Sequence, residues 1–225
     1  MALQERAVRT RRTILLAAAA VFAEVGYESA TIAQILQRAG VTKGALYFHF
    51  PSKRELAEAV LADQLGAVPE VPAQDLVLQE ALDTTFLVAH LLSRGDPLVR
   101  GGIRLTVEPG VLCEDFDSRA PLRGWVARSA GMLSRAKAHG ELLPHIDVDA
   151  AARMFVAAFT GVQLLSKILT GHADLAERTA DMERHLMASI AVPAVLLQLD
   201  MAPDRGARVH AQLCGRANRP PGRPS

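Results

Sequence analysis

The chain has 225 residues, which is long enough to bury a core in one or two domains, and half of its residues are apolar. The apolar runs are rich in Ala and Leu rather than in Val, Ile, Thr and Tyr, which favours an all-α fold. Two cysteines, Cys113 and Cys214, are too few for a disulfide scaffold, and no uninterrupted apolar run reaches the roughly 18 residues that span a bilayer, so we expect no membrane partner.

The net charge of +1 is divided unevenly along the chain. Residues 1–54 hold eight basic and three acidic side chains, a net charge of +5, whereas residues 55–225 hold 17 basic and 21 acidic ones, a net charge of −4. A basic head on an acidic body favours a polyanionic partner for the head. On charge alone, chance asymmetry is the alternative.

The first predicted helix spans residues 10–25 and ends at Gly26. Part of the same segment, ILLAAAAVFA at 14–23, follows three arginines and also resembles a signal peptide. Cleavage after Ala23 would discard a continuous apolar face, so we interpret the segment as the first helix of a DNA-binding module and expect the chain in the cytoplasm. The residues of that face are Ile14, Ala17, Ala18, Val21, Phe22 and Val25.

Three further helix starts follow at short intervals, each with a Ser or Thr as its predicted N-cap: Thr31, Thr42 and Ser52. After the first and the last of them, Gln or Glu stands three residues on, which is the spacing of a capping box. The second helix is expected to end near Gly40 and the fourth at Gly66. Four helices in under sixty residues, with a three-residue turn between the second and the third, predict a helix-turn-helix.

The remainder of the chain is also predicted to be helical. Two prolines break the helical pattern at residues 66–74, and Pro193 should kink the last helix or mark its final segment. The stretch 110–120 looks like a polar loop, and 215–225, rich in Gly, Pro and Arg, is expected to be disordered. The further helices are expected at about 75–94, 97–108, 121–139, 147–170 and 176–199. These patterns divide the chain into three parts: a helix-turn-helix DNA-binding domain at 1–54, a helical domain at 55–200, considered below for ligand binding and dimerisation, and a partly disordered tail at 201–225.

The segment GVTKGALYFHF, residues 40–50, crowds three aromatic residues just after a lysine. The second helix of a helix-turn-helix enters the major groove with its N-terminal residues, so Lys43 is placed to contact a phosphate or guanine, and Tyr47, one turn later, a phosphate oxygen. Gly44 lets the backbone approach DNA closely. The predicted DNA-contacting residues are Thr42, Lys43, Gly44, Ala45, Tyr47, His49 and Lys53. Three others are expected to form the core of this small domain: Leu46, Phe48 and Phe50.

The run TIAQILQRAGVTKGALYFHFPSKREL, residues 31–56, resembles the TetR family of bacterial transcriptional regulators, and the resemblance is strong over residues 10–60. GVTKGALYFHF is particularly similar to the γ-butyrolactone autoregulator receptors of that family. The resemblance continues more weakly into the body, at 139–166 and at Trp125, which stands where those receptors carry a tryptophan over their ligand pocket. It implies a homodimeric repressor that binds double-stranded, palindromic operator DNA. Such a repressor leaves the operator on binding a small, mostly apolar signal of lactone or furan type, and the family's usual role is control of antibiotic production.

Four residues of the body are candidates for ligand contact. A lone tryptophan in a helical domain is more often core than a ligand platform, and for Trp125 the resemblance favours the platform. Helix 147–170 is apolar on nearly all sides, so one face can serve its own domain and another a partner subunit, with 176–199 beside it. The polar candidates are Thr160, Gln163 and Gln64; an exposed helix-end position is the alternative for Gln64.

No constellation of residues supports an enzyme, because the sequence has no P-loop, no G-x-G-x-x-G and no nucleophile elbow. The spacing of His139, Glu141 and His145 is not that of H-E-x-x-H, so we expect neither a metal nor a cofactor. Three alternatives stay open: an enzyme with a helical pocket, a DNA-architectural protein without a ligand, and a pseudo-receptor that answers to antibiotics.

Overall fold

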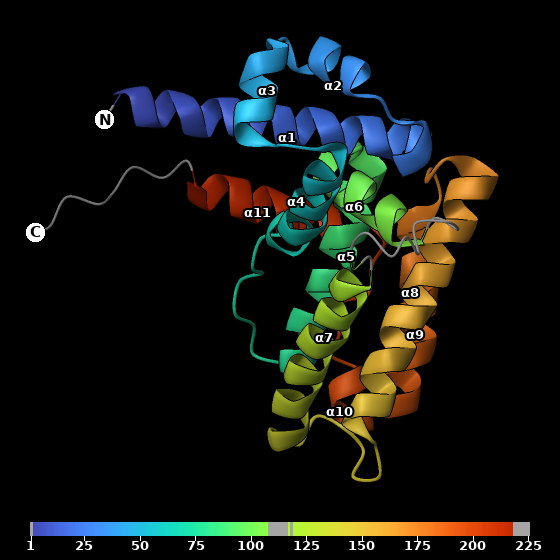
Figure 1. The fold of residues 1–225 in the computed structure, drawn as a ribbon. Helices are drawn as coiled ribbons and strands as arrows, with labels where there is room; N and C mark the ends of the chain where they lie inside the picture. The colour runs from blue at the N-terminus through green and yellow to red at the C-terminus, as the bar shows by residue number, and fades with distance from the viewer. Residues whose placement is uncertain (1, 108–116, 118, 218–225) are drawn as a thin grey trace, which may run out of the picture. The chain divides into compact units, whose positions relative to one another are not determined.

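The computed structural model describes residues 2–107, 117 and 119–217, and this part of the chain is helical, without strands (Figure 1). The predicted loop at 110–120 and the end of the tail, residues 218–225, lie almost wholly outside the described residues. The chain forms two compact units, one of residues 1–67 with 95–124 and one of residues 68–94 with 125–225. The all-α prediction is therefore confirmed for the described chain.

The first unit is built on one long helix, α1 (Ala2–Ser29). It begins before the predicted start at residue 10 and continues past Gly26, whose φ of 79° interrupts the helical backbone. Glycine adopts such a φ without strain, which explains why the kink falls at this residue. Ile14, Leu15, Ala18 and Phe22 are fully buried on one side of α1, as their helical spacing predicts.

The helix-turn-helix follows as α2 (Ile32–Ala39) and α3 (Lys43–His49) (Figure 1). Thr31 and Gln34 make the reciprocal capping box, and Gly40 ends α2 with a φ of 64°. The Oγ1 atom of Thr42 accepts the Ala45 amide at 3.3 Å and so begins α3. The predicted boundaries of both helices are confirmed because each depends on local chemistry that the sequence displays.

Two further helices complete the first unit: α4 (Lys53–Gly66) and α6 (Pro97–Val107). Both pack on α1 and share its core, which includes Leu56, Val60, Leu98 and Leu105. Gly101 of α6 lies so close to α1 that a Cβ atom there would stand 2.4 Å from the carbonyl oxygen of Ala19. The structure thus groups α4 and α6 with the head, whereas the predicted boundary lay at residue 54.

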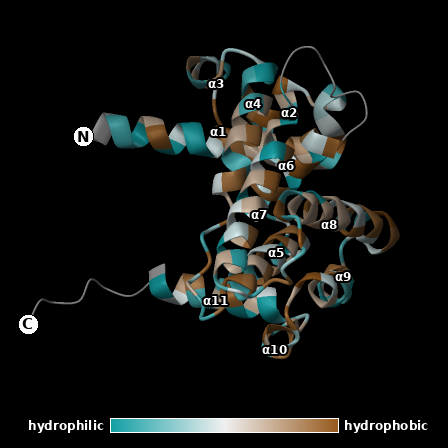
Figure 2. Cartoon of the chain, turned by 90° about the horizontal axis from the view of Figure 1, so that it is seen from below, coloured by the Kyte–Doolittle hydropathy of each residue, from teal (hydrophilic) through white to brown (hydrophobic). Residues whose placement is uncertain are grey.

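The second unit contains α5 (Val77–Arg94), α8 (Val148–Thr170), α9 (Leu175–Ile190), α10 (Pro193–Leu196), α11 (Arg205–Ala217) and most of α7 (Ala120–Ala138). Asp147 caps α8, Gly171 ends it with a φ of 65°, and α9 packs beside α8 (Figure 1). Pro193 separates α10 from α9, as predicted for the last segment. Figure 2 shows how strongly apolar α8 is.

Helix α11 is a departure from the predicted tail at 201–225. Arg205 donates from Nε and Nη2 to the two carboxylate oxygens of the buried Asp83, at 2.7 Å each. Gly206 packs directly against the backbone of Phe86, so that a Cβ atom there would overlap the Phe86 carbonyl. These contacts join residues 120 and 122 positions apart in the sequence, so the local composition of the tail did not reveal them.

Candidate functional site

Helix α3 has one buried side and one exposed side. Successive residues of an α-helix are rotated by about 100°, so Leu46 lies about 160° around the helix from both Gly44 and Phe48. Leu46 is fully buried, whereas Lys43 and Gly44 are exposed, Tyr47 is 40% exposed and Phe48 is 80% exposed. The prediction that Phe48 is core is therefore wrong. Two residues apart on a helix, Leu46 and Phe48 cannot both point inward.

Lys43 and Tyr47 lie side by side on this exposed face. The Nζ atom of Lys43 stands 5.9 Å from the centre of the Tyr47 ring, one helical turn along. His49 is only half-buried, and its ring meets the Phe48 ring edge-on with centroids 5.1 Å apart. Ala45 is also half-buried, while Thr42 is exposed and uses its hydroxyl oxygen as the N-cap. The structure thus brings a cation, a phenol and a phenyl ring to one surface of a short helix.

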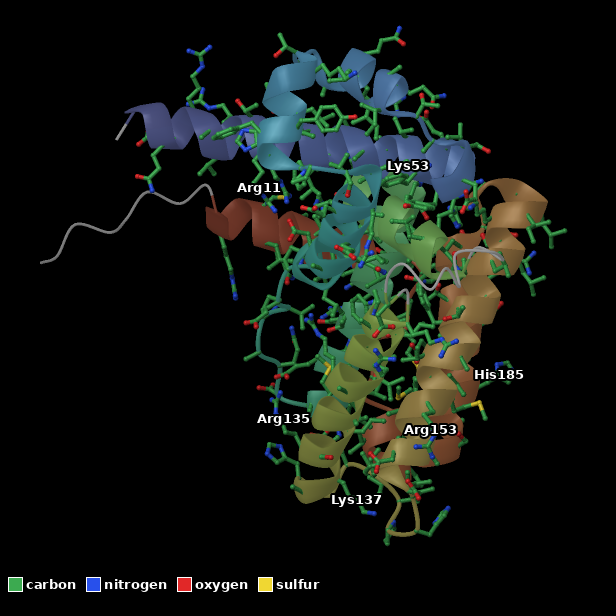
Figure 3. The ribbon with its side chains drawn as sticks, in the orientation of Figure 1. Arg11, Lys53, Arg135, Lys137, Arg153 and His185 are labelled. Atoms are coloured by element: carbon green, nitrogen blue, oxygen red, sulfur yellow. The ribbon has the colours of Figure 1, made fainter. Side chains whose placement is uncertain are left out.

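Lys53 has a different place from the one predicted for it. Its ammonium donates to the carbonyl oxygens of Tyr27, Glu28 and Ala30 at 2.9, 3.3 and 3.1 Å, and it lies 4.5 Å from the centre of the Tyr27 ring. The end of α1 and the turn before α2 are therefore held by this one cation, which Figure 3 labels. Lys53 therefore braces the helix-turn-helix where α1 ends, and its ammonium does not extend the basic edge of α3.

Arg11 makes the corresponding contact at the other end of the motif. Its guanidinium lies 4.7 Å from the centre of the Phe50 ring, and Phe50 is the buried residue that ends α3 (Figure 3). Stacking of a guanidinium on an aromatic ring is a favourable interaction. Sequence reasoning missed this pair because its members are 39 positions apart and neither belongs to a local motif.

The four candidate ligand residues are divided between the units. Gln64 on α4 belongs to the first unit, where it is 2% exposed, so the alternative of an exposed helix-end residue is wrong. Its Oε1 atom has no hydrogen-bond partner within the described residues, and a Cβ atom at Gly102 would lie 2.7 Å from it. A buried amide oxygen without a partner is costly and often marks a site that an unseen polar group completes.

Trp125, Thr160 and Gln163 belong to the second unit. Trp125 on α7 is half-buried, and the guanidinium of Arg128 lies 5.8 Å from the centre of its ring. Thr160 donates its hydroxyl to the Val156 carbonyl at 2.7 Å, which leaves its oxygen free only to accept. Gln163, on the same helix α8, is buried.

Sequence reasoning missed Glu183, which lies in the middle of α9. The side chain is fully buried, and neither carboxylate oxygen has a hydrogen-bond partner within the described residues. Burial raises the pKa of Glu183 to about 8, because a desolvated carboxylate is disfavoured; the nearby Thr85 hydroxyl, which donates to the Ala81 carbonyl, opposes this shift only in part. The group is therefore mostly protonated at neutral pH. Its position among Thr179, Ala180 and Met187 on the buried side of α9 was the available signal.

Glu141, one of the residues considered for a metal, has a structural role. Its two carboxylate oxygens accept the backbone amides of Val77 and Leu78, at 2.9 and 2.8 Å, and so cap the start of α5 from 64 residues away. Among the described residues, no group of three or more His, Cys, Asp or Glu side chains is arranged to hold a metal ion.

A row of large apolar side chains is exposed on α8. Ile168 is 69% exposed, and its exposed apolar neighbours are Met154, Leu164, Leu165 and Leu169. Of the helices described in the structure, α8 is the one long and apolar enough to cross a membrane by length and composition. An exposed apolar face of this kind is also typical of a helix that packs against a second subunit.

Comparison with known proteins places these features in one family. Residues 14–60 match the bacterial regulatory proteins of the tetR family, and residues 77–193 match the tetracyclin repressor-like C-terminal domain. The A-factor receptor protein of Streptomyces griseus is 41% identical over 219 residues, which cover 97% of this chain and 76% of that protein.

Solved structures agree with this assignment. TylP, a TetR regulator from Streptomyces fradiae, is 61% identical and matches with a TM-score of 0.86 over 92% of this chain and 98% of its own. A γ-butyrolactone receptor described as ArpA-like is 30% identical and has a TM-score of 0.71, over 92% of this chain and 99% of its own. The chain therefore belongs to the TetR family of bacterial transcriptional regulators, and it is a DNA-binding repressor and not an enzyme.

Proposed function

We propose that this repressor leaves its operator when it binds a small, mostly apolar molecule of the γ-butyrolactone, butenolide or furan type. By this release the repressor controls antibiotic production. It acts in the cytoplasm. The observation that supports the proposal is the likeness to the A-factor receptor protein, which extends over 97% of the chain and so includes the helices after the helix-turn-helix. The likeness to a γ-butyrolactone receptor supports the same ligand class.

The exposed face of α3 is the proposed reader of the operator. Lys43 contacts a phosphate or a guanine, and the Tyr47 hydroxyl contacts a phosphate oxygen from the next turn. Gly44 lets the helix approach closely, and its exposed surface leaves room for a Cβ atom with nothing within 4 Å. Thr42, Ala45 and His49 flank this face, and Lys53 acts indirectly by fixing the end of α1.

A homodimer through α8 and α9 is the proposed assembly. Large aliphatic side chains such as Leu165, Ile168 and Leu169 are exposed in the single chain and gain most from burial against a second copy. Two copies related by a two-fold axis present two α3 helices to half-sites about 34 Å or a little more apart. The palindromic operator follows from that symmetry.

Trp125 is the proposed platform for the ligand, because a wide flat indole offers a large contact area with little side-chain entropy to lose. Gln163, Thr160 and Gln64 are the proposed polar contacts. The unpartnered Gln64 oxygen and the acceptor left on Thr160 both call for a hydrogen-bond donor such as a hydroxyl group of the ligand.

The experiment is a gel shift on an operator duplex selected by the protein itself from random-sequence DNA. We expect micromolar or lower concentrations of one compound from a panel of lactones, butenolides and furans to release the DNA. Release by an antibiotic and by no member of the panel would contradict the ligand class. Failure to select any duplex would contradict operator binding itself.

A further inference from the structure

The function described so far does not explain why the Phe48 side chain is exposed. Its ring is 80% exposed, more than that of any other aromatic residue among the exposed large hydrophobic side chains of the described chain. Phenylalanine gains strongly from burial, so a phenyl ring held in solvent marks a contact that is made elsewhere. On α3 the ring lies about 100° around the helix axis from Tyr47, on the exposed side that also carries Lys43 and Gly44.

The surroundings of Phe48 hold the ring at an open surface. The His49 ring meets it edge-on at 5.1 Å with an interplanar angle of 80°. Long side chains of a helix lean toward the preceding turn, and the residue one turn before Phe48 is Gly44. A Cβ atom on Gly44 would have nothing within 4 Å, so no side chain packs over Gly44 itself.

The residues around the Phe48 ring limit which partners the ring can contact. A single phenyl group beside an ammonium and a phenol is far too small an apolar area for a stable protein interface, which needs roughly 800 Å² on each partner. The major groove of DNA presents one apolar group among its hydrogen-bonding edges, the C5-methyl of thymine, and phenylalanine is among the side chains that contact it.

We propose that Phe48 packs against the C5-methyl group of a thymine in each operator half-site and so helps to specify that base. The inference rests on the proposed role of α3 as the operator reader. Lys43 and Tyr47 position the helix through contacts with the DNA backbone. Phe48 adds sequence discrimination by excluding water from one thymine methyl group.

The test uses the full-length protein and an operator duplex that it has selected from random-sequence DNA. Each thymine of a half-site is replaced in turn by uracil, which lacks only the C5-methyl group. We expect one or more positions per half-site at which uracil weakens binding of the parent protein about fourfold, the effect of one buried methyl-sized group. Phe48→Ala should bind the thymine and uracil duplexes equally.

Two variants keep the result interpretable. Tyr47→Phe is the matched control. It should retain the loss of affinity caused by uracil, because it alters a contact with a DNA phosphate and not one with the thymine methyl group. Phe48→Leu retains an apolar side chain, so it serves if Phe48→Ala binds too weakly to measure, and it should show a penalty smaller than that of the parent. Circular dichroism and thermal unfolding check that all three variants keep the parent's helical content.

Several outcomes would overturn the proposal. They are an operator with no uracil-sensitive position in the parent, a full penalty retained in both Phe48 variants, or a changed oligomeric state of Phe48→Ala with an unchanged penalty. If the uracil series is negative while Lys43→Ala weakens binding, only the Phe48 inference fails. If the parent selects no duplex, the proposed operator binding fails with it.

Discussion

The exposed faces of α3 and α8 both leave apolar side chains uncovered, but with different neighbours. On α3 the strongly exposed ring of Phe48 shares the exposed side of the helix with a lysine and a tyrosine. On α8 large aliphatic side chains recur along one helix, with Ile168 and Leu169 among the most exposed. A lone apolar group among hydrogen-bonding groups fits the edge of a DNA base, whereas an aliphatic row fits a second protein subunit.

The regions behind these faces differ as well. At the end of α1, Lys53 satisfies three backbone carbonyls with one ammonium, so this junction of the helix-turn-helix is well paired. Beside α8, Glu183 of α9 is buried without a hydrogen-bond partner in the described structure. A recognition surface needs rigid support, whereas a domain that responds to a ligand tolerates a less stable interior.

The largest effect is expected from a substitution on the exposed face of α8, which tests whether that face contacts a second subunit. Ile168→Glu should give a monomer in light scattering, because a charge placed in an aliphatic interface has no partner. Operator affinity should fall by about 10²- to 10⁴-fold, since two linked half-site contacts become one. Ala207→Glu, which adds the same charge at an exposed position of α11, should leave both properties unchanged. A dimeric Ile168→Glu would remove α8 from the interface.

A pH titration of stability examines the buried carboxyl in the second unit. The pKa of Glu183 is about 8 in the folded chain, above the value of 4.5 taken for an unperturbed glutamate, so the folded state binds the extra proton. Stability is therefore full at pH values below that ordinary pKa and declines as the pH rises through 8. Between pH 5 and pH 8 this group should remove on the order of 3 kcal/mol.

Glu183→Gln should remove that decline, because its amide stays neutral at every pH. Urea unfolding of both proteins at several pH values measures the difference. Asp181→Asn, an exposed acid on the same helix, is the control and should follow the parent. Parallel pH profiles for the parent and Glu183→Gln would show that the carboxyl is not buried in solution.

Lys53→Met tests the paired carbonyls at the end of α1 in the first unit. Three carbonyl oxygens at the end of α1 lose their charged donor, so the free energy of unfolding should fall by about 2 kcal/mol. Arg54→Met removes a charge that forms an exposed pair with Glu58 and should cost less than about 0.5 kcal/mol. If Lys53→Met keeps its stability but reduces the salt dependence of operator binding, Lys53 contacts DNA as the sequence first indicated.

Much of the first unit follows from local signals in the sequence. The caps at Thr31, Thr42 and Ser52 and the turn at Gly40 use side chains and backbone angles that neighbouring residues determine, so α2, α3 and α4 were predicted nearly to the residue. The family itself was visible in the same stretch. Phe48 was misplaced although helical spacing alone separates it from Leu46 by about 200°.

The rest depends on contacts between distant segments. Lys53 with Tyr27, Arg205 with Asp83 and Glu141 with Val77 join positions from 26 to 122 residues apart. No periodicity or motif announces such pairs, so helix α11 and the cap of α5 were missed. The burial of Gln64 and Glu183 depends in the same way on what packs around their helices.

The smallest of these effects concerns the α3 face. Lys43→Ala and Tyr47→Phe should each weaken operator binding by about 1 kcal/mol, or roughly fivefold, while the dimer stays intact. If Lys43 contacts a phosphate, the slope of log affinity against log salt should fall by about one for Lys43→Ala. Arg128→Ala, on α7, is the control for a lost positive charge. Parent-like binding of both α3 variants across a salt titration would mean that α3 is not the reader.

The most direct test of ligand-controlled release is a gel shift of the parent and Trp125→Ala on the same operator, titrated with the compound that releases the parent. A ligand moves the equilibrium only if it binds one conformation better than the other, so losing its platform should abolish the response without affecting DNA binding. We expect Trp125→Ala to bind the operator as the parent does and to stay bound at inducer concentrations that free the parent completely. Release of both proteins at the same concentration would contradict the assignment of Trp125 to the ligand site.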